Sequence, residues 1–285
     1  MQALAEFIMR RQFNAVCIAF VFAMLPLFEW LSAAAVALVT LHLGWRQGLI
    51  ILAWAGLSGV VRWSMGDMLT LPMLLLTFLA AAVLRQYVSL LYAIVTVSIL
   101  SAVVMILFQK IMPPGLEELI DKTAKMLTDM QFFDQLEIAD PTQWIHEFAL
   151  TSFGFSVAIA ALVSLLIGRW WQAKLYNPGG FQEEFHQLRL TPLVIGLLTG
   201  TAVVTVGLVP QLSFIGVLLS LPIFLAGIAL VHSVARIYNL GSQVLIPFYV
   251  LLVFLNGYMY LLLMLLVMVD SFMNIRQRLA AKSDQ

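Results

Sequence analysis

The sequence predicts an all-α, polytopic integral membrane protein with eight or nine hydrophobic segments. Two observations support this fold class. Hydrophobic residues make up 62% of the 285 positions and charged residues 11%, against roughly 45–50% and 25% in soluble domains. The charges also lie in short strips between long apolar runs, so the bilayer is the expected solvent for most of the chain.

A bilayer core about 30 Å thick requires roughly 20 apolar residues per helix. Nine segments reach or approach this length. The second and third of them are short, and they form either two thin, tilted spans or one re-entrant pair. In chain order the segments cover 12–28, 31–43, 48–61, 68–84, 87–108, 148–168, 191–209, 212–234 and 244–269.

Lys and Arg in short loops mark the cytoplasmic side. If every segment crosses, most of them share one side, and this predicts a bacterial inner (cytoplasmic) membrane protein with a cytoplasmic N-terminus. The basic tail from Arg276 would then lie outside, so one of the last three segments is expected not to cross, with 210–222 as the candidate. The residues that set the orientation are Arg10, Arg11, Arg46, Arg85, Arg169, Lys174, Arg189 and Arg236.

Three regions follow from this pattern. Residues 1–168 form a six-segment membrane bundle that includes an acidic extracytoplasmic loop, 110–146. Residues 169–190 form a cytoplasmic interfacial elbow, and 191–285 form C-terminal membrane helices and the basic tail. Within the acidic loop, apolar residues recur at helical spacing, which predicts an amphipathic helix that acts either as a lid or as an inert connector.

Net charge, cysteine content and sequence motifs indicate no nucleic-acid, metal or catalytic site. Fifteen basic residues balance fifteen acidic ones, so no net charge favours nucleic acid. The lone Cys17 excludes an internal disulfide and a CxxC site, and no metal, cofactor or catalytic constellation is expected. Neither intramembrane protease pattern fits, because Arg189 is one residue too far from Glu184 for the CAAX type and Ser156 lacks the following glycine of the rhomboid type.

The elbow is the most distinctive window. Its Trp and Tyr rings suit the headgroup layer, and its Asn-Pro-Gly-Gly run predicts a tight reversal in which both glycines have positive φ. The second arm reads as an interfacial amphipathic helix. The window is either a docking or headgroup-binding platform or a turn that only fixes depth. Its candidate residues are Arg169, Trp170, Trp171, Tyr176, Asn177, Pro178, Gly179, Gly180, Phe181 and Glu184.

Ionisable groups at membrane depth are costly, so each is a functional candidate. Glu29, Arg62 and Asp67 sit at predicted outer ends, where they either snorkel and pair or line an outward-facing ligand pocket. His232 lies deeper, as a packing residue or a proton carrier.

Small residues in the first segment recur at four-residue spacing in Ala15, Ala19 and Ala23. Such a face lets helices approach closely. It serves either packing inside the bundle or docking of a membrane partner.

This stripe and the short segments joined by the turn from Gly44 to Gly48 resemble the S-component fold of energy-coupling-factor transporters. In that family the stripe docks a coupling protein, and the outer helix ends close over a vitamin or metal. The sequences RWW and YNPGGF and the ending from Asp270 to Arg276 resemble the YybS-like bacterial inner-membrane proteins, whose function is unknown. That resemblance implies a cytoplasmic tail and supplies no activity.

The sequence thus predicts small-molecule or lipid-linked transport or binding, without an enzymatic activity. The alternative is a membrane scaffold or partner subunit in envelope assembly. The expected partners are the lipid bilayer and either another membrane protein or a second copy of the chain. A transporter should have a polar cavity open to one side, whereas a scaffold should have a filled bundle with an exposed apolar stripe.

Overall fold

The computed structural model describes residues 1–112, 114–130, 138, 140–209 and 212–283, and within these it contains helices and no strand. Five helices are long and apolar enough to cross a membrane: α5 (Thr70–Tyr87), α6 (Leu90–Ile111), α8 (Pro141–Tyr176), α11 (Ser213–Ile237) and α13 (Asn256–Met273). Four apolar helices are shorter: α2 (Gln12–Met24), α3 (Glu29–Leu43), α10 (Pro192–Leu208) and α12 (Leu245–Phe254).

The N-terminal bundle is built around α3. Every residue from Leu31 to Leu41 is buried, and α3 packs against α2, α4 (Trp45–Ser64), α5 and α8. Its alanines allow this crowding because they let neighbouring backbones approach. A Cβ on Gly168 of α8 would lie only 2.6 Å from the Cβ of Ala37, so the α3–α8 contact depends on small residues on both sides.

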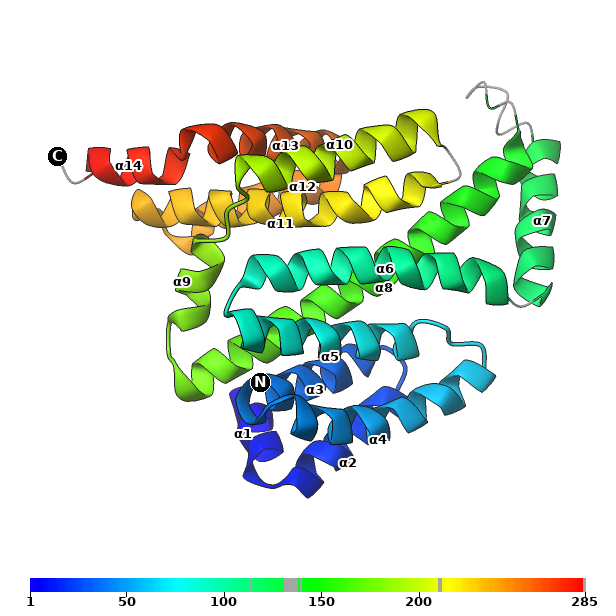
Figure 1. Cartoon of the computed structure of the whole chain (residues 1–285), viewed down its shortest axis with the longest axis horizontal. Coiled ribbons are helices and arrows are strands. Elements are labelled where there is room, and N and C mark those ends of the chain that lie inside the picture. Colours follow the sequence, from blue (N-terminus) through cyan, green and yellow to red (C-terminus); the bar gives the residue numbers. More distant parts are fainter. Residues whose placement is uncertain (113, 131–137, 139, 210–211, 284–285) are drawn as a thin grey trace.

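The long helix α8 runs diagonally through the molecule and connects its two ends (Figure 1). It begins at an N-cap, where the Asp140 carboxylate accepts a hydrogen bond from the Gln143 amide at 3.0 Å. At that end lies the amphipathic helix α7 (Pro114–Asp129), whose Ile120 and Ala124 are buried together with Ile145 of α8. We call this end of the molecule the α7 face; part of the acidic loop lies outside the described residues.

The opposite end, at the left of Figure 1, carries α1 (Gln2–Arg10), α9 (Gly180–His186) and α14 (Ile275–Ser283). We call it the elbow face. The C-terminal helices form a second group, in which α11 packs on α10 and α13 and also on α6 and α8 of the first bundle.

The stretch 210–222, which the sequence offered as the non-crossing candidate, belongs largely to one long helix. Helix α11 continues through Pro222 from Ser213 to Ile237, and 210–211 lie outside the described residues. The last apolar stretch is instead broken at Leu255, between α12 and α13.

Both ends of this broken stretch lie at the elbow face. Tyr249 of α12 contacts His232 near the end of α11, and Asp270 at the end of α13 contacts Arg189. Between them, Tyr260 of α13 reaches Ser220 in the first half of α11. Both ends of the stretch therefore lie on the same side of the molecule, and Arg276 and Arg278 of α14 follow there.

Candidate functional site

The elbow reverses the chain between α8 and α9. Gly179 has a φ of +89°, which residues with a Cβ rarely adopt. Gly180 does not have the positive φ that the sequence predicted. It is restricted by packing instead, since a Cβ there would lie 2.8 Å from the Asn177 Cγ. Gly179 is thus restricted by its backbone conformation, whereas a side chain at Gly180 would have to displace the Asn177 side chain.

An ion pair holds α9 against α8. The Arg169 Nε lies 2.7 Å from a Glu184 carboxylate oxygen, and both side chains are less than a fifth exposed. Arg169 also donates to the Gln172 side chain, which donates in turn to the Leu41 carbonyl of α3. The second arm of the elbow is therefore fixed to the core of the N-terminal bundle.

The elbow aromatics have different environments. Tyr176 is 48% exposed and stacks on His42 with ring centroids 3.7 Å apart. Trp171 is fully buried, and its indole N–H has no partner among the described residues. Adjacent residues on a helix point about 100° apart, and Trp171 points into the protein. The prediction that the Trp171 ring faces the headgroup layer is therefore wrong.

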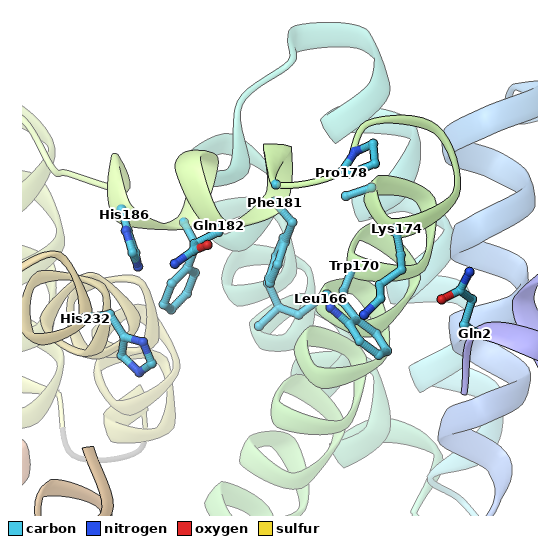
Figure 2. A pocket seen from close by; sticks show the side chains of 12 residues that line it. Gln2, Leu166, Trp170, Lys174, Pro178, Phe181, Gln182, His186 and His232 are labelled. Carbon is cyan, nitrogen blue, oxygen red and sulfur yellow. The ribbon is translucent and has the colours of Figure 1, made fainter. Parts of the chain in front are cut away.

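Beneath the elbow lies a cavity of about 620 Å³, a size typical of small-molecule sites. We call it the elbow cavity. It separates α8 from the end of α11 and is covered by α9 (Figure 2). Its lining residues are Gln2, Leu166, Trp170, Ala173, Lys174, Pro178, Gly179, Phe181, Gln182, Phe185, His186 and His232.

The walls of the elbow cavity combine aromatic and aliphatic side chains with polar and cationic ones. Phe181 and Phe185 stack with centroids 6.0 Å apart. Lys174 lies over the Trp170 ring, with the Nζ 5.3 Å from the centroid. His186 and His232 lie on the side opposite Trp170 and Lys174 in Figure 2. An amphiphile could place its tail against the rings and its head at the cationic and imidazole groups.

A second cavity of about 790 Å³ adjoins the first, and His186 lines both. We call it the arginine cavity, because Arg189, Arg236 and Arg276 share its wall. Its one lining carboxylate is that of Glu183. The elbow face thus carries an apolar cavity and a cationic one, which have His186 in common.

The three arginines differ in how many of their N–H groups already donate hydrogen bonds within the protein. Arg189 donates to the backbone carbonyls of Asp270 and Ser271 at 3.0 and 2.7 Å. Arg276 donates to the His186 carbonyl and lies 3.5 Å from the buried Asp270 carboxylate. For Arg236, the hydrogen bond in the described part of the chain is to the His186 Nδ1 at 3.5 Å. Arg236 therefore keeps free N–H donors.

Burial lowers the pKa of His186 below its ordinary value, and the nearby Arg236, His232 and Arg276 lower it further. Each of these effects disfavours the imidazolium. His186 is consequently a neutral hydrogen-bonding group between the two cavities.

At the α7 face, Arg62 brings together the three predicted outer residues. Its guanidinium lies 2.7 Å from Asp67 and 3.4 Å from Glu29. Asp67 also accepts hydrogen bonds from the Leu69 backbone and the Thr70 hydroxyl. The side chains are 14–20% exposed, and none lines the two cavities at the elbow face. Here they form an ion-pair cluster that joins α3, α4 and the start of α5.

The alanine stripe lies inside the bundle. Ala15, Ala19 and Ala23 are at most 2% exposed, and α2 packs against α3 and α4. Ser32 of α3 donates to the Ala19 carbonyl at 2.6 Å. The three alanines therefore serve the packing of α2 against α3 and α4.

Sequence reasoning missed Asp270, His186 and Arg236. Asp270 carried a usable signal, since it is an ionisable residue ending an apolar run. His186 and Arg236 come from different helices, and nothing in their local sequence predicts their contact. The described residues also contain no cluster of three or more His, Cys, Asp or Glu that could hold a metal ion.

Comparisons with known proteins give no independent information about the site. No family model, no curated protein and no solved structure matches this chain.

Proposed function

We propose that this chain is a non-enzymatic multi-pass membrane protein that binds an amphiphilic small molecule or lipid-linked compound for transport or presentation. The observation that carries the proposal is the elbow cavity. It combines aromatic and aliphatic walls with a cationic rim, and it lies where apolar helices meet an amphipathic interfacial helix. Amphiphiles partition into this kind of environment.

The orientation is part of the same proposal. We place the elbow face in the cytoplasm of a bacterial cell, with both termini there, because short basic loops favour that side. Four basic residues lie toward the α7 face: Arg62, Lys110, Lys122 and Lys125. The others lie toward the elbow face, and these now include Arg276, Arg278 and Lys282 of α14.

The scaffold alternative has less support. A docking surface on the first membrane helix would need its small-residue stripe to be accessible, and that stripe is buried against α3 and α4. A scaffold has no need of a cavity at the elbow.

The test is retention of an amphiphile by the purified protein. A larger side chain at Leu166 would fill the cavity, whereas the same change at Val163, which is 42% exposed on the same helix, would point elsewhere. Native mass spectrometry of protein extracted in a mild detergent should show a bound amphiphile in the wild type and in Val163→Trp. Leu166→Trp should lack it. Equal retention by the two variants would refute the cavity as the binding site.

A further inference from the structure

We infer that the bound amphiphile carries a phosphomonoester head, which occupies the arginine cavity while its tail occupies the elbow cavity. This inference rests on the proposed function. Its geometric basis is that His186 lines both cavities. The molecule we infer passes beside His186, from the apolar walls at Leu166 and Phe185 to the guanidinium of Arg236.

The charge of the arginine cavity favours an anionic head. Three guanidinium groups face one lining carboxylate, that of Glu183. The buried Asp270 behind the wall compensates one further positive charge through its contacts with Arg276 and Arg189. The cavity keeps an excess of positive charge, and Lys174 adds to it at the rim of the elbow cavity.

The geometry favours a phosphate group over other heads. Arg236 retains free donors in a planar fork, and such a fork matches the oxygens of a phosphate or a carboxylate. The larger negative charge of phosphate decides between the two. A phosphomonoester carries about 1.5 to 2 negative charges at pH 7 and presents three acceptor oxygens. A choline head would place an ammonium beside Arg236, and an uncharged sugar would leave the cationic wall uncompensated.

Binding of dioctanoyl phosphatidic acid tests this inference. Its affinity is measured by native mass spectrometry, with the full-length protein released from nanodiscs of uncharged lipid. Dioctanoylglycerol supplies the same tail without phosphate, decanoic acid supplies a carboxylate head, and inorganic phosphate supplies the head without a tail. Arg236→Gln removes the free guanidinium. Arg278→Gln is the matched control, since it removes an exposed arginine of α14 that lines neither cavity.

Phosphatidic acid should bind about tenfold more tightly than dioctanoylglycerol, as expected for one charge-assisted contact worth about 1.4 kcal/mol. Arg236→Gln should abolish this difference and Arg278→Gln should keep it. Equal binding of the phosphate, carboxylate and uncharged amphiphiles would overturn the phosphate inference and leave the proposed function intact. Binding of inorganic phosphate as tightly as the lipid would overturn the lipid source. Binding of none of them would overturn both proposals.

Discussion

Arg189 and Asp270 join the elbow to the end of the last apolar helix: the Arg189 guanidinium donates to the Asp270 carbonyl at 3.0 Å. The Asp270 side chain is 2% exposed and faces Arg276 at 3.5 Å. One of its carboxylate oxygens also accepts the Ile275 backbone N–H, which fixes the start of α14. Asp270 is thus the point at which the elbow, α13 and α14 are held together.

Replacing Asp270 should therefore destabilise the protein strongly. Asp270→Ala leaves Arg276 buried without its carboxylate, a loss that typically costs about 3–5 kcal/mol. The measurement is the melting temperature of the purified protein. Asp129→Ala removes an exposed carboxylate from α7 and should change it little. Similar melting temperatures for the two variants would contradict the role assigned to Asp270.

Arg62→Gln should loosen the α7 face. The change leaves Glu29 and Asp67 facing each other without a cation, at a cost of about 1.5–3 kcal/mol for hydrogen bonds to charged groups. Unfolding in mixed micelles gives the free energy. Arg46→Gln, at an exposed position on the other face, is the control. A loss of ligand binding without a loss of stability would revive the ligand-pocket interpretation of this cluster.

Gly179→Ala should destabilise the elbow by about 1 kcal/mol or more, because its φ of +89° is unfavourable for a residue with a Cβ. Gly196→Ala is the matched control, since a Cβ there meets no atom within 4 Å and favours the helix. Limited proteolysis at the elbow reports the difference. Equal cleavage rates would show that the turn tolerates a side chain.

The pH dependence of stability should contain a contribution from His186. The groups around it are Arg236 and His232 of α11, Arg276 of α14, Lys174 of α8, and Glu183 and Arg189 of its own segment. Because its pKa is lower in the folded protein than its ordinary value of 6.5, the unfolded chain binds more protons near that pH. The free energy of unfolding should then rise with pH between the lowered pKa and 6.5.

The melting temperature of the wild type, measured across that interval, should fall with acidification more steeply than that of His186→Gln. His146→Gln, at the α7 face, should retain the wild-type slope. Identical slopes for all three proteins would exclude His186 as the responsible group.

Cysteines at Thr128 and Gln277, both exposed, should report opposite sides of the membrane in a Cys17→Ser background. An impermeant maleimide should label Thr128→Cys in cells whose outer membrane is permeable, and Gln277→Cys only after the inner membrane is lysed. Labelling of both positions in intact cells would contradict the return of α12 and α13 to the elbow face.

Periodicity and local turn chemistry predicted much of the architecture. The apolar runs became helices, the loop from Pro114 to Asp129 became an amphipathic helix, and Gly179 takes its expected conformation. These features depend on neighbouring residues, which a sequence displays directly. The break at Leu255 was missed although Asn256 and Gly257, residues typical of turns, directly follow it. The apolar run resumes at Tyr258, and its total length suggested a single segment.

The sequence predicted only part of the candidate site. The elbow residues stood out through their aromatic and glycine content, but Gln2 and His232 complete the elbow cavity and Arg236 lines the arginine cavity. These residues lie far from the elbow in sequence, and only tertiary packing brings them together. Trp171 shows the converse, since a residue typical of interfaces is buried by the helix face on which it happens to lie.

The most direct test of the account is an experimental density map of the protein in a lipid nanodisc. The account predicts elongated non-protein density in the elbow cavity, extending from Leu166 past Phe185 toward His186. A cavity filled by rearranged protein side chains, with no such density, would contradict it.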